Sequence, residues 1–205
     1  IVNDVVEDYI RHTLKDADGL LKELEVFAEE NSVPIVHKEV SDLLKVLLKM
    51  QKPQRILEVG CAIGYSSILF ATTCEDNVDI TTCERNPVMI ERAKENIKRA
   101  GFENNIRILE GDAVEQLKNV EGEFDMIFLD AAKGQYKLFY DLVIDKLKVG
   151  GVLISDNILY KGMIASDDLV VRRKKTIVKR MRNYLDYICN CDYLTTSLLP
   201  MGDGV

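Results

Sequence analysis

Carboxylate and amide side chains follow two short apolar segments that predict consecutive strands of a sheet. Asp130 comes directly after residues 124–129, and Asp156 and Asn157 follow residues 152–155. If these strands border one cleft, the three side chains converge as oxygen ligands, which suit a hard divalent cation such as Mg²⁺. A helix cap at Asp130 and a turn at Asp156 would explain each motif alone. Because the motifs occur together beside a predicted cofactor cleft, we expect a metal site.

Lys133 lies three residues after Asp130 and is the candidate general base. A free lysine is protonated at neutral pH, so by itself it is a poor base. A nearby divalent cation would disfavour the ammonium form by charge repulsion, and it would also acidify a bound hydroxyl group. The deprotonated oxygen could then act as a nucleophile. The alternative is an ordinary surface lysine at the start of a helix.

A glycine loop follows the first predicted strand, residues 55–59, within the sequence ILEVGCAIGYS. Gly60 and Gly64 would let a ligand approach the backbone at the carboxyl end of a strand, where such sheets bind ligands. The loop lacks the Gly-Lys-Ser/Thr of a P-loop, and Ala62 replaces the middle glycine of the dinucleotide motif. The remaining pattern, E-x-G-x-x-x-G, suits a ligand without a pyrophosphate.

Two further motifs follow the next two predicted strands. Glu84 comes directly after residues 80–83, where an acid can accept hydrogen bonds from both hydroxyls of a ribose. Gly111-Asp112-Ala113 follows the third strand, in a position to meet the edge of an adenine. An acid after a strand is usually a solvated turn residue. In series at consecutive strand ends, however, the three motifs favour an adenosine-bearing cofactor.

The elements that would position these residues form two parts. Within residues 1–52, apolar residues at helical spacing predict three amphipathic helices, with Val2, Val5 and Val6 in the first. From residue 53 onward, apolar strands alternate with helices, which predicts an α/β, doubly wound parallel sheet. The predicted strands are 55–59, 78–83, 106–109, 124–129, 152–155 and a last one at 193–198. The predicted helices of this part are 65–73, 87–100, 113–118, 135–147 and 169–189.

The composition of the 205-residue chain fits one domain, since 47% of the residues are hydrophobic and can form a sizeable core. The net charge of −7 disfavours a uniformly basic nucleic-acid-binding protein but allows a local basic patch. No apolar run approaches the roughly 20 residues of a membrane span. Five cysteines without a C-x-x-C pair predict reduced thiols in the cytoplasm. Because the chain lacks an initial methionine and residues 202–205 predict the start of another strand, we expect both natural ends to be missing.

Taken together, these motifs resemble the cation-dependent O-methyltransferases related to catechol and caffeoyl-CoA O-methyltransferases. The similarity covers nearly the whole chain and includes VPI at 33–35, LEVGCAIGYSS, CERN at 83–86, GDA, FLDAAKGQY, SDNILYKG and MGDG. The resemblance implies S-adenosylmethionine as the cofactor and a Rossmann-like class I methyltransferase fold. It also implies a seven-stranded sheet with an antiparallel last strand, and a homodimer.

The resemblance assigns a role to each candidate site residue by its position in these motifs. The cofactor would be held by Val36, which closes its pocket, and by Glu58, Gly60, Ser66, Glu84, Asp112, Ala113 and Asp130. The metal would be bound by Asp130, Asp156 and Asn157, with Lys133 as the base. The deprotonated acceptor oxygen would then attack the sulfonium methyl group.

A basic stripe on the long predicted helix indicates the acceptor. Arg172, Lys175, Lys179 and Arg182 recur at three- and four-residue steps and therefore share one helical face, which suits phosphates. The alternative is an ordinary solvated helix face. Together with the AAKGQY segment, the basic run at 172–175 resembles the short bacterial enzymes that methylate 5-hydroxyuridine in transfer RNA.

Alternative acceptors and functions remain open. Small-catechol enzymes carry aromatic residues after the metal aspartate, whereas Ala131 and Ala132 follow here, so a transfer-RNA acceptor is expected. The alternative is a small catechol-like metabolite or another compound with vicinal hydroxyls. A non-catalytic module that binds an adenosine cofactor would not need the metal trio, and the loop sequence disfavours a nicotinamide dehydrogenase.

Overall fold

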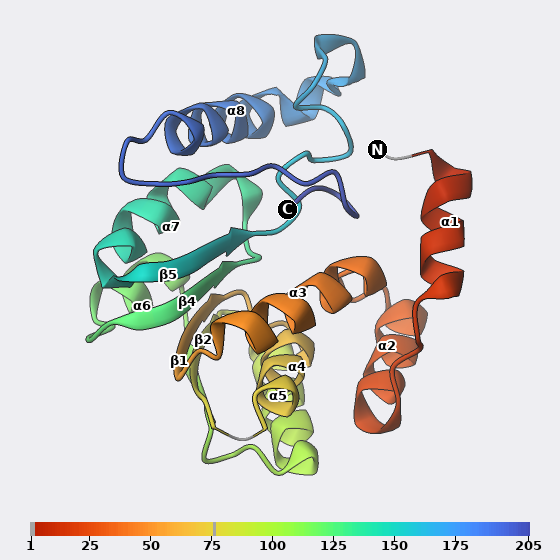
Figure 1. Ribbon diagram of the computed structural model, residues 1–205, viewed down its shortest axis with the longest axis vertical. Coiled ribbons are helices and arrows are strands. Elements are labelled where there is room, and N and C mark those ends of the chain that lie inside the picture. Colours follow the sequence, from red (N-terminus) through yellow and green to blue (C-terminus); the bar gives the residue numbers. More distant parts are fainter. Residues whose placement is uncertain (1–2, 76) are drawn as a thin grey trace.

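A parallel sheet of five strands lies at the centre of the computed structural model, which describes residues 3–75 and 77–205. The strands are β1 (Arg55–Val59), β2 (Asp79–Glu84), β3 (Ile106–Glu110), β4 (Phe124–Leu129) and β5 (Leu147–Ser155). Their spatial order is β3-β2-β1-β4-β5 (Figure 1). Val59 pairs with Cys83 on one side and Leu129 on the other. The carboxyl ends of the three middle strands therefore meet at one edge, as the sequence predicted.

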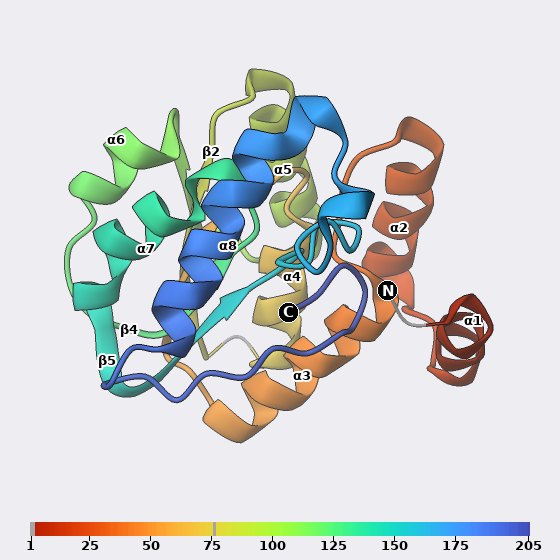
Figure 2. The same cartoon turned by 90° about the horizontal axis from the view of Figure 1, so that it is seen from above.

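Helices cover both faces of this sheet (Figures 1 and 2). The helices are α1 (Asp4–Thr13), α2 (Gly19–Asn31), α3 (Lys38–Gln51), α4 (Tyr65–Thr73), α5 (Pro87–Ala100), α6 (Ala113–Lys118), α7 (Tyr136–Val143) and α8 (Lys175–Cys189). Side chains alternate between the two faces of each strand. In β4, Met126 and Phe128 join the core beneath α2 to α5, whereas Ile127 and Leu129 join the core beneath α6 to α8. This arrangement is the predicted doubly wound α/β fold.

Two of the predicted helices are shorter than expected. The helix predicted at 135–147 is divided into a 3₁₀ turn, α7 and a second 3₁₀ turn, and β5 already begins at Leu147. The helix predicted at 169–189 begins only at Lys175. Val170 and Val171 have extended backbones, with ψ angles of 111° and 132°. Because β-branched residues favour extended conformations, these two valines separate a 3₁₀ turn at Asp167–Leu169 from a second one at Arg172–Lys174, which leads directly into α8.

The strand predicted at 193–198 does not form. This segment has no regular secondary structure and does not join the sheet. The chain turns back on itself beyond it, where Leu199 and Val205 exchange backbone hydrogen bonds of 2.7 and 3.0 Å. Alternating residue types favour a strand only when a neighbouring ladder is available to pair with it. The seven-stranded sheet is therefore wrong for the described residues, which contain five strands, all parallel.

The helix α1 is attached mainly by polar contacts. The guanidinium of Arg11 donates two hydrogen bonds to the buried carboxylate of Glu39 on α3, at 2.9 and 3.0 Å. The ammonium of Lys38 donates to the carbonyl oxygens of Arg11 and Leu14, both at 2.8 Å. The apolar residues Val5, Val6, Tyr9 and Ile10 remain exposed. Val2, assigned to this helix from sequence, lies outside the described residues.

Two global features complete the description of the fold. Within residues 3–75 and 77–205, no helix combines the length and the apolar character needed to cross a membrane. All five cysteines lie in these ranges, and each is a free thiol.

Candidate active site

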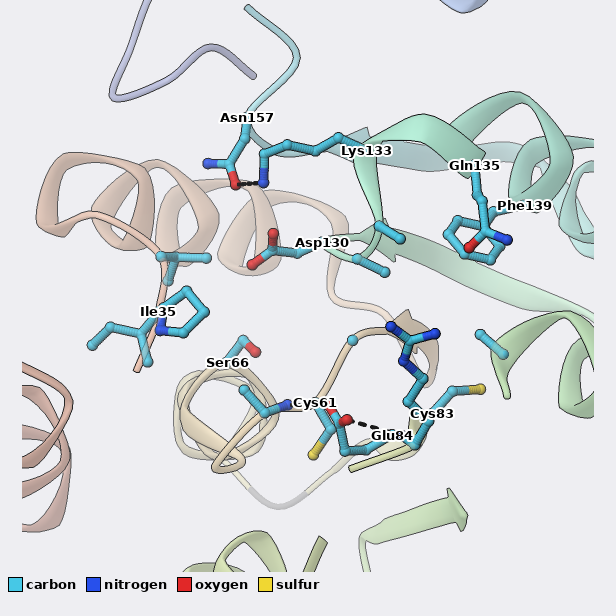
Figure 3. Close-up of a pocket in the computed structure, with 18 of the residues that line it drawn as sticks. Ile35, Cys61, Ser66, Cys83, Glu84, Asp130, Lys133, Gln135, Phe139 and Asn157 are labelled. Atoms are coloured by element: carbon cyan, nitrogen blue, oxygen red, sulfur yellow. Dashed lines mark hydrogen bonds between the residues drawn. The ribbon is translucent and has the colours of Figure 1, made fainter. Parts of the chain in front are cut away.

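A cavity of about 330 Å³ opens at the carboxyl ends of β1, β2 and β4. Its lining includes most of the residues that the sequence singled out (Figure 3). These are Val36, Gly60, Ser66, Glu84, Asp112, Ala113, Asp130, Lys133 and Asn157. Glu58 and Asp156 are fully buried and lie behind the lining. The sequence therefore located the cavity, and the contacts below indicate what each side chain can do in it.

The glycine loop between β1 and α4 packs tightly against the end of β4. Gly60 has a φ of 107°, and a Cβ atom there would lie 2.1 Å from the carbonyl oxygen of Asp130. No side chain fits this position, so a glycine is required by the neighbouring backbone as well as by any ligand. Ala62 also has a left-handed backbone, with a φ of 45°, and its N–H points toward Glu84. The loop therefore holds the β1, β2 and β4 ends together.

Glu58 supports this loop from below. Its carboxylate is fully buried and accepts hydrogen bonds from the hydroxyls of Ser66 and Ser67 at the start of α4. Burial raises the pKa of Glu58, and the two hydroxyls oppose that shift. These contacts indicate that Glu58 orients Ser66, which itself lines the cavity. A direct contact between Glu58 and the cofactor stays a prediction.

Glu84 is held rigidly at the end of β2. One carboxylate oxygen accepts from the N–H of Ala62 at 2.9 Å, and the other accepts from the N–H groups of Arg85 and Asn86 at 2.8 Å each. A carboxylate has about four acceptor sites, so the oxygen bonded to Ala62 keeps one site free. A hydroxyl group of a ligand in the cavity can donate to that site.

Asp112 precedes α6, Ala113 is its first residue, and both line the cavity. Asp112 caps the helix, because one of its oxygens accepts from the N–H of Val114 at 3.0 Å. Its other oxygen lies 4.0 Å from the guanidinium of Arg85, a cavity residue that the sequence analysis missed. Arg85 follows Glu84 directly, but no spacing rule marks it. These exposed charges form the rim of the cavity rather than its floor.

Asp130 and Asp156 lie side by side because Leu129 pairs with Ser155 in the sheet. One oxygen of Asp156 accepts from the N–H of Asn157 at 2.7 Å, while the other is buried and has no hydrogen-bond partner among the described residues. Burial raises the pKa of Asp130, and burial together with the charge of Asp130 raises that of Asp156. The two carboxylates thus disfavour each other's negative charge, which a cation between them would relieve.

This set of donors fits a hard divalent cation. It offers two carboxylates, one with an unpaired oxygen, and the amide oxygen of Asn157, all of which are ligand types that Mg²⁺ accepts. In the described part of the chain, no three histidine, cysteine, aspartate or glutamate side chains are grouped to hold an ion. A cation held by the two carboxylates would take the amide oxygen of Asn157 as a further ligand.

The side chain of Lys133 is hydrogen-bonded to the amide oxygen of Asn157 in this structure. The hydrogen bond runs from its ammonium to the Oδ1 atom and is 2.6 Å long. It lies at the end of the cavity that Asp130 lines (Figure 3). Asn157 has a left-handed backbone, with a φ of 57°, which asparagine tolerates better than most residues. The lysine and the carboxylate pair predicted from sequence are thus brought together in one place.

Comparisons with known proteins identify the family of this chain. The model of the O-methyltransferase family matches residues 12–205. This chain belongs to that family. A caffeoyl-CoA O-methyltransferase of Medicago sativa is 31% identical over 176 residues, which cover 79% of this chain and 69% of that protein.

Solved structures extend the similarity of this O-methyltransferase. A Staphylococcus aureus protein assigned as a caffeoyl-CoA O-methyltransferase shares 40% identity and a TM-score of 0.86, covering 98% of this chain and 95% of that one. The methyltransferase PaMTH1 of Podospora anserina, solved with SAH bound, shares 25% identity and a TM-score of 0.88, covering 98% and 92%. The chain is therefore an enzyme of the methyltransferase class, related to the caffeoyl-CoA type.

The O-methyltransferase also contains anchoring residues that the sequence analysis missed. The hydroxyl of Tyr136 lies 2.6 Å from the carbonyl oxygen of Asp156 and 3.1 Å from that of Leu129. It therefore ties together the ends of β4 and β5, which carry the two carboxylates. Gln135 and Phe139 line the cavity beside it. Gln135 ends the 3₁₀ turn before α7 and Phe139 lies on α7, and the sequence did not show which face of this segment turns to the cavity.

The basic stripe of this O-methyltransferase divides into two kinds of residue. Arg172, Lys175 and Lys179 are exposed. Arg182 instead donates to the carbonyl oxygens of Ile164 and Met163, at 2.9 and 3.2 Å, and pairs with an aspartate of the same loop. Arg182 thus holds the loop before α8, and the other three residues of the predicted stripe are exposed to solvent.

Proposed function

We propose that this chain transfers a methyl group from S-adenosylmethionine to a hydroxyl oxygen, assisted by a divalent cation at Asp130, Asp156 and Asn157. The observation that carries the proposal is the layout of the cavity. It has a carboxylate with a free acceptor site, Glu84, at one end and Asp130 with Lys133 at the other (Figure 3). The SAH-bound relative supports the choice of cofactor.

The cofactor would lie along the ends of β1, β2 and β3. Glu84 would accept from a ribose hydroxyl, while Asp112 and Ala113 would border the adenine. Val36, which is buried and lines the opposite wall, would close the pocket over the methionine part. The negative charge of Asp130 would favour the positive sulfonium at that end of the cavity.

The residues of this chain would carry out the transfer as follows. Lys133, in its neutral form, takes the proton of the acceptor hydroxyl onto Nζ. The oxygen then forms a bond to the methyl carbon while the carbon–sulfur bond breaks, and the bonding electrons remain on sulfur as a neutral thioether. A bound divalent cation would polarise the acceptor oxygen and make its proton easier to remove. Before reacting, Lys133 must leave the oxygen of Asn157 that it contacts in this structure.

For the acceptor, we favour a 5-hydroxyuridine in transfer RNA. The exposed residues Arg172, Lys175 and Lys179 offer contacts to phosphates on a protein that is acidic as a whole. Ala131 and Ala132 line the cavity and leave room beside Asp130 for a base. The second candidate is a small catechol-like metabolite, which the similarity to caffeoyl-CoA O-methyltransferases favours.

A methyl-transfer assay with labelled S-adenosylmethionine tests the proposal. The acceptors are transfer RNA that contains 5-hydroxyuridine, the same RNA without the hydroxyl group, and a catechol. Each reaction is run with chelator and after Mg²⁺ is restored. We expect label only on the hydroxylated RNA, and only with metal. Label on the catechol alone would select the second candidate, and full transfer in excess chelator would contradict the cation site.

A further inference from the structure

The loop that follows β5 has an unfavourable backbone. Asn157, Tyr160 and Lys161 have φ angles of 57°, 46° and 56°, in the left-handed region that side chains other than glycine rarely adopt. Asparagine tolerates this region through local hydrogen bonds, but tyrosine and lysine gain no such compensation. A loop of this kind keeps its shape only when contacts from elsewhere hold it.

The C-terminal turn supplies these contacts. The N–H of Ile158 donates to the carbonyl oxygen of Gly204 at 3.0 Å, and that of Leu159 donates to the carbonyl oxygen of Asp203 at 2.9 Å. The N–H of Lys161 donates to the Asp203 carboxylate. Asp203 thus holds two positions of the loop, one through its backbone and one through its side chain.

The glycines on either side of this aspartate let the turn fit closely. A Cβ atom at Gly204 would lie 2.4 Å from the Cγ atom of Leu159, and φ at this glycine is 92°. A Cβ atom at Gly202 would lie 3.1 Å from side-chain atoms of His37 and Val40. The turn is therefore packed between the loop and the start of α3.

The Asp203 carboxylate shares the electrostatic environment of the site without lining the cofactor cavity. Burial raises the pKa of Asp203, while the hydrogen bond from the N–H of Lys161 and, after it, the charge of Lys133 oppose that shift. After burial and the charge of Asp130, the charge of Asp203 also contributes to raising the pKa of Asp156. Asp203 therefore lies close enough to influence the carboxylate pair, while its Oδ1 atom accepts from the N–H of Lys161 in the loop.

We propose that Asp203 is a positioning residue. Its bonds to Leu159 and Lys161 fix the loop that presents the amide oxygen of Asn157 to Lys133 and to a divalent cation. This inference rests on the proposed function, because it concerns the same cation site.

The test compares Asp203→Ala with Asp203→Asn in the full chain, and uses Mn²⁺ as a paramagnetic probe. Asp203→Ala should weaken Mn²⁺ binding by about 10-fold or more, the usual effect of losing a residue that orients a ligand. Asp203→Asn keeps an oxygen that can accept from Lys161, so it should restore most of the affinity. Asp192→Ala, at an exposed aspartate nearer the end of α8, should bind Mn²⁺ like the unaltered chain.

Hydrogen–deuterium exchange at residues 158–161 provides a second readout that needs no metal. Exchange should become faster in Asp203→Ala and stay slow in Asp203→Asn. If Asp203→Ala does not fold, Gly204→Ala replaces it, since the added methyl group displaces the same turn from Leu159. Unchanged Mn²⁺ binding and exchange in Asp203→Ala would overturn the inference, as would an equal loss in Asp203→Asn. A failure of the unaltered chain to bind Mn²⁺ would refute the cation site instead, and the exchange rates would still decide the role of Asp203.

Discussion

At the residue scale, the proposed chemistry depends on carboxylates that keep one hydrogen-bond acceptor site free for a ligand or an ion. Among the described residues, no group donates to one buried oxygen of Asp156, and a buried polar atom of this kind is costly unless a ligand or ion completes it. The half-buried Glu84 has a free acceptor site although it already receives three backbone N–H groups. The amide oxygen of Asn157 differs from these carboxylates, because it already accepts a hydrogen bond from Lys133. The site is thus ready for a cation and a cofactor, but the lysine must move.

Lys133→Ala tests the lysine. As a general base, Lys133 should contribute about 10²–10⁴-fold to turnover, so the variant should lose that factor while its affinity for S-adenosylmethionine stays the same. Steady-state rates and calorimetry measure the two quantities. Lys137→Ala, which removes an exposed pair with Asp141 on the same segment, is the matched control. A Lys133 variant with normal turnover would show that the lysine is only structural.

Glu84→Ala tests the ribose contact. The variant should bind S-adenosylmethionine more weakly by about 1–3 kcal/mol, the range for hydrogen bonds to a charged group. Glu110→Ala is the control, because Glu110 pairs with Glu84 in the sheet but lies outside the cavity lining. Calorimetry measures the affinity of both variants for S-adenosylmethionine. If Glu84→Ala binds the cofactor as tightly as Glu110→Ala does, the assignment of Glu84 to the ribose is refuted.

At the element scale, the sequence predicted the central strands and the helices α4 to α6, but it misplaced the beginnings of β5 and α8 and added a strand at 193–198. The strands β1 and β4 are buried on both faces, so their apolar runs mark them directly. The beginning of α8 was misplaced because helical spacing continues through Val170 and Val171, whose extended backbones break the helix. In the site, the carboxylates at strand ends were predictable from topology. Arg85, Tyr136 and Asp203 were not, because their roles depend on contacts between segments distant in sequence or on loop geometry.

The pair of Arg11 and Glu39 joins α1 to α3 and makes stability depend on pH. Burial is the largest influence on the pKa of Glu39 and would raise it, but the hydrogen bonds from Arg11, a backbone hydrogen bond and the charge of Arg11 together hold the pKa below its usual value. Because the pKa is lowered in the folded state, the stabilisation is present above the unfolded value of about 4.3 and is lost as the pH falls through the folded value.

Glu39→Gln should therefore lower the free energy of unfolding by about 1–3 kcal/mol at pH 7. The difference from the unaltered chain should shrink as the pH is lowered below about 4. Urea denaturation at several pH values measures it. A difference that is constant with pH would show that the ion pair does not stabilise the fold. Glu95→Gln, at an exposed position of α5, controls for the change of charge.

At the scale of the whole molecule, an acidic chain exposes a local group of basic residues. Arg172, Lys175 and Lys179 lie at or near the start of α8. If they contact phosphates, reversing the charge of Arg172 and Lys175 should weaken RNA binding and lower the salt slope by about 1 for each lost contact. Methylation of a catechol should not change.

Filter binding at several salt concentrations measures this slope. Lys15→Glu with Lys49→Glu reverses two exposed charges elsewhere and serves as the control. An equal loss in both double variants would indicate a general charge effect and would remove the support for an RNA acceptor.

The most direct test of the cation site is a crystal structure with SAH and Mn²⁺, with anomalous scattering used to locate the ion. We predict one Mn²⁺ ion at about 2.1 Å from oxygen atoms of Asp130, Asp156 and Asn157, as for a Mg²⁺-sized cation, with the Lys133 ammonium displaced from the Asn157 oxygen. A cavity that holds SAH while Lys133 stays on Asn157, with no ion between the two carboxylates, would contradict the account.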